Sequence, residues 1–188
     1  MGTDGQGIRT LIVVSDCPLR CKYCINPFTW NGSAPSKFLT AQDILKRTEV
    51  DTLYMLATKG GFTFGGGEPL LYPDLIKEFR SICDSDLTIY VETCLNVPFS
   101  NIESIMDAVD YFIVDIKTMD EEIYTAYTGG QLSVALDNLK KLAAVKGDSI
   151  LVRIPIIPGY VDKEGQLLGR EKLLELGIKK IDLCRYKV

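Results

Sequence analysis

The sequence of 188 residues contains no histidine. This absence excludes a Ser-His or Cys-His nucleophilic pair, a zinc site built on histidines and a histidine proton shuttle. If the chain is an enzyme, its chemistry has to come from sulfur, carboxylates, lysine or a bound cofactor.

Long apolar runs and basic tracts are missing as well. The longest apolar runs, such as 11–14 and 154–157, fall far short of the roughly 20 residues of a membrane span. The formal net charge is −4 and no basic tract is present, so we expect neither a membrane nor a nucleic acid as a partner. The N-terminus has no basic region followed by an apolar one, which predicts a cytoplasmic protein without a signal peptide. Disulfides are rare in that compartment, so clustered cysteines indicate metal binding or catalysis.

Strand-like and helix-like segments alternate along the chain. Short apolar or β-branched runs predict strands at 11–14, 62–64, 88–93, 111–117, 150–157 and 180–183. Helix signals begin near residues 40, 73, 100, 132 and 163. This alternation predicts a single α/β domain over residues 1–188 with a parallel sheet, either open and doubly wound or a partial barrel. In both arrangements, ligands are expected at the carboxyl ends of the strands.

Half of the six cysteines fall within eight residues, directly after the first predicted strand. Cys17, Cys21 and Cys24 have the spacing C-x3-C-x2-C. A structural zinc site usually takes four ligands, and the chain offers no histidine and no fourth cysteine nearby. Three thiolates better match an iron–sulfur cluster that keeps one iron open to another ligand. Two other interpretations remain: reduced cysteines packed as small apolar residues, and a zinc knuckle completed by a partner chain.

This cysteine motif, with Tyr23 as the aromatic residue before the third cysteine, resembles that of the radical S-adenosylmethionine (radical SAM) superfamily. The stretch Gly65-Gly-Gly-Glu-Pro69 after the second strand is similar to the glycine-rich stretch of the same superfamily. Residues 4–10, 115–117 and 153–159 resemble segments of the glycyl-radical-enzyme activating enzymes. The resemblance runs from about residue 4 to about residue 187, which is nearly the whole chain.

The resemblance implies a partial (β/α)6 parallel barrel of the radical SAM type, with a [4Fe-4S] cluster and S-adenosyl-L-methionine as cofactors. It implies an anaerobic oxidoreductase in which the reduced cluster cleaves S-adenosylmethionine. The 5′-deoxyadenosyl radical then removes hydrogen from a backbone glycine of a glycyl radical enzyme such as pyruvate formate-lyase. Flavodoxin or ferredoxin is the implied reductant. Such chemistry needs no general base, which suits a chain without histidine, and the protein mainly supplies binding and orientation.

The resemblance also assigns roles to individual residues. The expected cluster ligands are Cys17, Cys21 and Cys24, and Lys117 is expected to reach the cofactor or substrate. The expected cofactor-binding residues are Tyr23 at the adenine, Gly66, Gly67 and Glu68 at the methionine moiety, Glu92, Thr93 and Asp115 beside a monovalent cation, and Arg153 at the cofactor carboxylate. The chain departs from the family pattern at Ile25, Glu92 and Lys187, and at 93–96, where relatives have Thr-Asn-Gly.

Arg153 is also notable from its position alone. It lies between two apolar residues of a predicted strand, so its side chain faces the opposite side from theirs. An unpaired buried arginine is costly, which favours a ligand or a carboxylate partner. Lys117 could equally be a surface lysine.

Three functions remain open. The leading hypothesis is a radical SAM activase that installs a glycyl radical on a partner enzyme. The second is a radical SAM enzyme that acts on a peptide or a small molecule. The third is a non-catalytic protein that uses its cysteines for a structural metal or for electron transfer.

Overall fold

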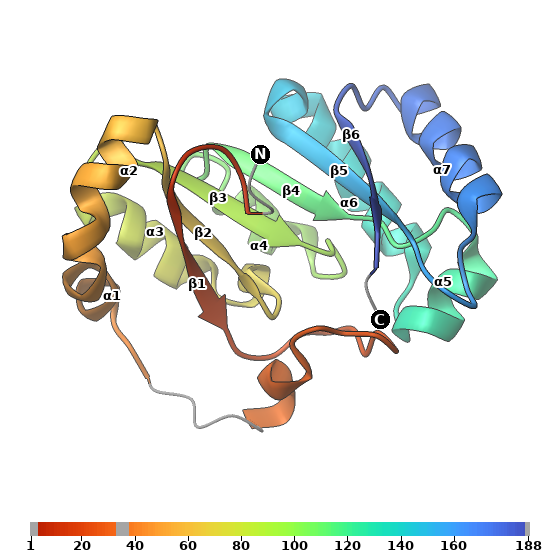
Figure 1. Cartoon of the computed structure of the whole chain (residues 1–188), viewed down its shortest axis with the longest axis horizontal. Helices are drawn as coiled ribbons and strands as arrows, with labels where there is room; N and C mark the ends of the chain where they lie inside the picture. Colours follow the sequence, from red (N-terminus) through yellow and green to blue (C-terminus); the bar gives the residue numbers. More distant parts are fainter. Residues whose placement is uncertain (1–3, 33–37, 187–188) are drawn as a thin grey trace. The chain divides into compact units, whose positions relative to one another are not determined.

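The computed structural model describes residues 4–32 and 38–186 (Figure 1). Its strands are β1 (Arg9–Val14), β2 (Gly61–Gly66), β3 (Thr88–Thr93), β4 (Tyr111–Asp115), β5 (Ile150–Ile156) and β6 (Ile181–Arg185). They follow one another in the sheet in chain order, and β1 pairs with β2, β2 with β3 and β5 with β6 in parallel. The predicted α/β class with a parallel sheet is therefore confirmed. Lys187 lies outside the described residues.

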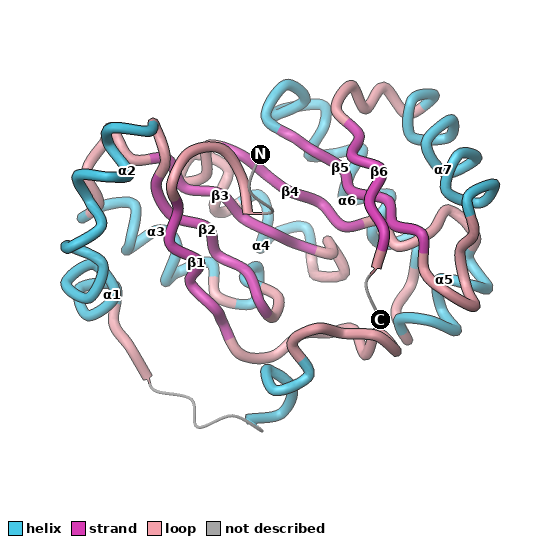
Figure 2. The backbone as a smooth tube through the Cα atoms, in the orientation of Figure 1, coloured by secondary structure: helices cyan, strands magenta, loops and turns pink. Residues whose placement is uncertain are grey.

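Helices occupy the connections between the strands (cyan in Figure 2). They are α1 (Ala41–Thr48), α2 (Thr52–Thr58), α3 (Pro73–Ile82), α4 (Phe99–Glu103), α5 (Glu121–Thr128), α6 (Leu132–Lys146) and α7 (Lys163–Glu175). Short 3-10 segments are η1 (Pro27–Gly32), η2 (Glu49–Asp51), η3 (Pro69–Leu71) and η4 (Gly147–Ser149). The sequence pattern did not predict α2 or α5. In the part of the chain that is described, no helix combines the length and apolar character that a membrane span requires.

Contacts within the chain define two compact units. The first comprises the described residues of Met1–Cys17, Asn26–Glu92 and Ser100–Phe112. The second comprises Pro18–Ile25, Thr93–Phe99 and the described residues of Ile113–Val188. The single domain expected over residues 1–188 stays a prediction.

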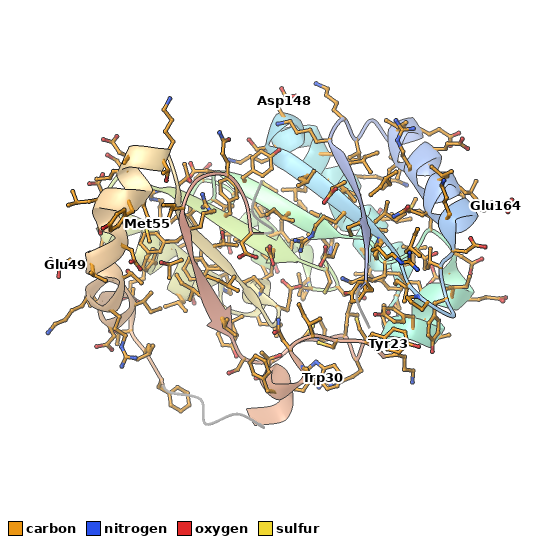
Figure 3. All side chains as sticks on the ribbon, in the orientation of Figure 1. Tyr23, Trp30, Glu49, Met55, Asp148 and Glu164 are labelled. Carbon is orange, nitrogen blue, oxygen red and sulfur yellow. The ribbon has the colours of Figure 1, made fainter. Side chains whose placement is uncertain are left out.

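In the first unit, β1, β2 and β3 run in parallel and the helices α1, α2 and α3 accompany them (Figure 1). Phe62 and Phe64 alternate along β2, and both rings meet the edge of Phe79 from α3, at centroid distances of 4.8 and 5.4 Å. Met55 of α2, labelled in Figure 3, is also fully buried. Burying large aromatic side chains in edge-to-face contact stabilises the packing of helix on sheet.

A half-buried arginine ties these three strands together. Arg9 donates from Nε to Thr63 Oγ1 at 2.8 Å and from its terminal nitrogens to Thr88 Oγ1 at 2.8 Å and to the carbonyls of Thr88 and Phe62. Its guanidinium carbon lies 3.6 Å from the centre of the Tyr90 ring. Burial lowers the pKa of Arg9 to about 10, against the charges of Asp110 and Asp4, which leaves it charged at neutral pH. The hydrogen-bond partners of this cation on β2 and β3 are therefore neutral groups, and the carboxylates act on it through space.

In the second unit, α7 packs against β5 and β6 (Figure 1). The buried Gln166 of α7 donates from Nε2 to the carbonyls of Ile154 and Cys184, both at 2.8 Å. The buried Asn138 of α6 donates to the carbonyls of Leu95 and Val97 after β3, also at 2.8 Å. Because buried carbonyls need donors, these two amides hold the strand ends that border the predicted site.

Candidate functional site

The loop after β1 carries the clustered cysteines as half-buried thiols. Asp16, just before Cys17, has a left-handed backbone with a φ of 61°, and its carbonyl accepts from the N–H of Glu68 at 2.8 Å. At the other end of the motif, the N–H of Cys24 donates to the carbonyl of Cys21 at 3.1 Å. Each end of the motif is therefore held in a defined turn.

The middle of this loop is anchored to the end of α5. The N–H of Arg20 donates to the carbonyl of Thr128 at 2.7 Å, and the N–H of Lys22 donates to the carbonyl of Tyr127 at 3.1 Å. Cys21 lies between these two anchors. The backbone on both sides of Cys21 is thus fixed by main-chain hydrogen bonds.

The cluster ligands stay a prediction. Among the described residues, no three Cys, Asp or Glu side chains are grouped closely enough to hold one metal ion. The thiolates of a [4Fe-4S] cluster each bind a different iron, so they need not converge on one point. Cys17, Cys21 and Cys24 are half-buried thiols without disulfides, the chemical state that thiolate ligands require.

Tyr23 packs in a group of aromatic rings within the second unit (labelled in Figure 3). Its ring centroid lies 6.1 Å from those of Tyr127 and Tyr160, in edge-on geometry. The expected contact of Tyr23 with an adenine stays a prediction. The packing gives its ring a fixed orientation, which a stacking partner needs.

Glycines at the end of β2 allow its backbone to lie unusually close to the end of β1 and to the turn that follows β1. Gly66 has a φ of 85°, and a Cβ on it would meet the side chain of Val13 at 2.5 Å. A Cβ on Gly67 would lie 2.2 Å from the carbonyl oxygen of Asp16. The side chain of Asn26 donates to the carbonyl of Gly66 at 3.2 Å. Any larger residue at these positions would push the turn after β2 away from the turn that precedes the first cysteine.

Glu68 is almost fully buried, with 1% of its surface exposed. Its Oε1 accepts from the N–H of Leu70 at 3.1 Å and so caps η3. This cap gives the carboxylate a structural role that the motif did not reveal. Its expected contact with the cofactor ammonium stays a prediction.

Glu92 and Thr93 end β3 and belong to different units. In the first unit, Glu92 is half-buried and one of its carboxylate oxygens lies beside Gly65 of β2. In the second unit, the buried Thr93 accepts through Oγ1 from the N–H of Leu95 at 2.9 Å. Leu95 has a φ of 56°, so this bond stabilises a turn that leucine rarely adopts. Their expected role beside a monovalent cation stays a prediction.

Three of the expected site residues meet at the ends of β4 and β5. Asp115 Oδ1 accepts from Arg153 Nε at 2.6 Å, and its Oδ2 accepts from Lys117 Nζ at 3.0 Å. Lys117 also donates to the hydroxyl of Tyr186 at 3.0 Å. The carboxylate partner expected for Arg153 is therefore Asp115, and Lys117 is buried rather than a surface lysine. We call Asp115, Lys117 and Arg153 the charged trio.

The charged trio stays ionised. Burial raises the pKa of the Asp115 carboxyl, but the charges of Lys117 and Arg153 outweigh burial and hold that pKa well below its usual range. Burial disfavours the Lys117 ammonium in the same way, but Asp115 and Tyr186 outweigh it and raise the pKa of Lys117 well above its ordinary value. Both cations therefore keep their charge and hold the carboxylate of Asp115.

Two tyrosines of this site were not predicted. Tyr186 follows β6, and its place after a strand end was the signal that could have found it. Tyr127 lies on α5, whose existence the sequence pattern did not reveal. Both rings border the cysteine loop or the charged trio within the second unit.

The chain shows clear similarity to known proteins. Residues 11–169 match the family described as the Radical SAM superfamily. A pyruvate formate-lyase-activating enzyme of Clostridium pasteurianum is 32% identical over 186 residues, covering 97% of this chain and 77% of the relative. An enzyme of the same name from Staphylococcus aureus (strain USA300) is 32% identical over 196 residues, covering 99% and 78%.

Solved structures share the fold at lower identity. Streptococcus suis SuiB bound to S-adenosylmethionine has a TM-score of 0.68 at 17% identity over 97% of this chain, which spans 41% of SuiB. A domain of a pyruvate-formate lyase-activating enzyme from Bacteroides vulgatus has a TM-score of 0.51 at 22% identity, covering 66% of this chain and 98% of that domain. These similarities confirm the predicted fold class, the partial parallel barrel of the radical SAM type.

Proposed function

This chain belongs to the radical SAM superfamily, and we propose that it is an activase that installs a glycyl radical on a partner enzyme of the pyruvate formate-lyase type. It is a radical SAM enzyme, with the superfamily's [4Fe-4S] cluster and S-adenosylmethionine as cofactors. The observation that carries the proposal is the 32% identity, over nearly the whole chain, to activating enzymes from two organisms.

In this proposal, Cys17, Cys21 and Cys24 hold the cluster through their thiolates. When bound, the cluster supplies the electron that cleaves S-adenosylmethionine. The anchored turn between Cys21 and Cys24 supports this role, because it presents two thiols from a rigid backbone. Rigid presentation matters because a radical must form at a fixed place relative to its target.

The remaining residues bind and orient S-adenosylmethionine. Tyr23 faces the adenine, while Gly66, Gly67 and Glu68 meet the methionine moiety. Asp115 holds the Arg153 guanidinium in place on β5, which supports a role for Arg153 in holding the cofactor carboxylate, with Lys117 reaching the cofactor or substrate. Glu92, Thr93 and Asp115 provide oxygens for a monovalent cation.

The partner and the reductant follow from the same relationship. The names of the relatives imply a glycyl radical enzyme as the substrate, whose backbone glycine loses a hydrogen atom. A flavodoxin or a ferredoxin is the proposed electron donor. The absence of histidine supports this chemistry, because hydrogen-atom removal requires no general base.

The test is an anaerobic assay with two readouts. The chain is reconstituted with iron and sulfide, reduced with dithionite and mixed with S-adenosylmethionine and a pyruvate formate-lyase. We expect 5′-deoxyadenosine by chromatography and, in the same sample, a glycyl radical by electron paramagnetic resonance (EPR). Cys21→Ala should abolish both signals. Cys83→Ala, which removes a buried thiol at the end of α3 in the other unit, is the matched control and should retain them.

The readouts separate the competing functions. 5′-Deoxyadenosine without any glycyl radical would contradict the activase and support a radical SAM enzyme that acts on a peptide or a small molecule. An intact, reduced cluster that yields no 5′-deoxyadenosine would contradict both the activase and the radical SAM enzyme with another substrate.

A further inference from the structure

Tyr127 stands at the centre of the aromatic group beside the cysteine loop. It is fully buried. Its ring centroid lies 5.0 Å from Tyr160, 6.1 Å from Tyr23 and 6.4 Å from Tyr186, all in edge-on contact. This packing explains the position of the ring but leaves the role of its hydroxyl open.

The hydroxyl of Tyr127 is an exception among buried polar groups. Of the buried side-chain nitrogen and oxygen atoms in residues 4–32 and 38–186, this oxygen alone has no hydrogen bond of ordinary geometry. The backbone of Tyr23 lies close to it and acts as a donor, which leaves the phenolic proton without an acceptor. On the same helix, the hydroxyl of the equally buried Tyr124 accepts from the side chain of Asn96 at 2.8 Å. A buried donor without an acceptor is destabilising, so the presence of this hydroxyl indicates an acceptor that is present only in the loaded protein.

Cys21 is the predicted cluster ligand that packs against Tyr127. The backbone bonds from Arg20 and Lys22 to the last two residues of α5 hold Cys21 beside this helix end. Cys21 also packs on the core cluster that Tyr127 forms with Ile157 and Val161. The ordinary pKa of a phenol is about 10, so at neutral pH the Tyr127 hydroxyl has a proton to donate.

We propose that the Tyr127 hydroxyl donates a hydrogen bond to the sulfur of Cys21 when the cluster is bound, and thereby raises the reduction potential of that cluster. Hydrogen bonds to the sulfurs are one of the factors that set the potential of an iron–sulfur cluster. Lys117 also lies close enough for its charge to interact with Cys21, but its ammonium already serves Asp115 and Tyr186. The inference rests on the cluster-binding part of the proposed function.

The test compares Tyr127→Phe with the unsubstituted chain after anaerobic reconstitution. A redox titration followed by the EPR signal of the reduced cluster gives the midpoint potential. Losing one neutral hydrogen bond should shift the reduction equilibrium roughly threefold to tenfold toward the oxidised form. That change is about 30 to 60 mV more negative, at about 59 mV per tenfold for one electron. Tyr124→Phe, one turn earlier on α5, is the matched control and should leave the potential unchanged.

Two further measurements separate a hydrogen bond from a structural effect. In the protein without cofactors, Tyr127→Phe should match or exceed the melting temperature of the unmodified chain, whereas Tyr124→Phe should lower it. In deuterated buffer, electron–nuclear double resonance (ENDOR) of the reduced cluster should show an exchangeable deuteron that Tyr127→Phe removes. An unchanged potential with that deuteron still present would overturn the proposal.

The outcome is independent of the partner enzyme. If the unmodified chain gives no glycyl radical but its potential depends on Tyr127, the activase proposal fails and this inference stands. If the unmodified chain takes up no cluster, as shown by iron and sulfide content, the inference is overturned.

Discussion

The basic side chains of the two units are satisfied in opposite ways. In the first unit, the half-buried Arg9 donates to threonine hydroxyls and backbone carbonyls and lies over a tyrosine ring, all of them neutral groups. In the second unit, Lys117 and Arg153 both pair with the carboxylate of Asp115. Burial prevails in the first case and lowers the pKa of Arg9, whereas in the second Asp115 and Tyr186 together outweigh burial and raise the pKa of Lys117.

This difference indicates that Arg9 has a structural role, whereas Lys117 and Arg153 are suited to ligand binding. The partners of Arg9 lie on neighbouring strands, so they fix the register of β1, β2 and β3. The charged trio lies on β5 and at the carboxyl end of β4, and ligands of α/β proteins bind at the carboxyl ends of strands. We therefore expect changes at Arg9 to affect stability and changes in the charged trio to affect catalysis as well.

The largest effect is expected for Asp115→Asn. The substitution leaves Lys117 and Arg153 without their carboxylate, and breaking a buried ion pair costs about 3–5 kcal/mol. We expect the free energy of unfolding to fall by about 3 kcal/mol and the rate of 5′-deoxyadenosine formation to fall roughly a hundredfold. Urea denaturation and the anaerobic assay measure the two quantities.

The control for this prediction is Asp148→Asn. Asp148, labelled in Figure 3, pairs with Lys179 on the exposed surface, and its removal should change neither quantity noticeably. If Asp115→Asn behaved like this control, the charged trio would contribute to neither stability nor catalysis.

Arg9→Met tests the other half of the comparison. The carbonyls of Phe62 and Thr88 would lose their donor, and we expect the free energy of unfolding to fall by about 2–3 kcal/mol. The rate of 5′-deoxyadenosine formation per folded molecule should stay within about twofold. A large loss of rate in protein that retains its fold and its iron would contradict the structural role assigned to Arg9.

The sequence predicted strands more reliably than short helices. The predicted strand at 88–93 is β3 itself, whereas the strand predicted at 111–117 ends at Asp115. Strands buried on both faces are continuous apolar runs, which are easy to find. α5 was missed because its eight residues are stabilised by the Asp120 cap and by burial of Tyr124 and Tyr127 rather than by helix propensity.

The site shows the same limit. The residue types of the charged trio were predicted from separate motifs, but their mutual contacts depend on how β4 and β5 end. Glu68 was expected at a ligand, and its cap on η3 became visible only in the structure. No sequence pattern predicts that the hydroxyl of Tyr127 lacks a hydrogen bond of ordinary geometry, because this depends on which groups surround the hydroxyl in the folded chain.

Arg153→Lys should have a smaller effect that is specific to the cofactor. Lysine keeps the charge but lacks the planar set of donors of arginine. In the proposed function, that set holds Asp115 and the carboxylate of S-adenosylmethionine at the same time. We expect the KM for S-adenosylmethionine to rise about tenfold, equivalent to roughly 1.4 kcal/mol, while kcat changes little. Initial rates over a range of cofactor concentrations give both constants. An unchanged KM with a reduced kcat would mean that Arg153 does not contribute to cofactor binding in the ground state.

The smallest effect is a difference in acid response between the two networks. The pKa of Asp115 is depressed in the folded state, so its pairing stabilises the protein above its unfolded pKa of roughly 3.9 and is lost as the pH falls through the lower folded value. At pH 6, Lys117→Met should lower the free energy of unfolding by about 1 kcal/mol or more, and this gap should narrow below about pH 4. The gap for Arg9→Met should narrow less over the same range, because the hydrogen-bond partners of Arg9 are neutral and the carboxylates of Asp110 and Asp4 act on it only through space. Urea denaturation of the three cofactor-free proteins from pH 7 to pH 3 provides the measurement. A gap for Arg9→Met that narrows as much as the gap for Lys117→Met would mean that carboxylates hold both cations equally, and the distinction between the two networks would fail.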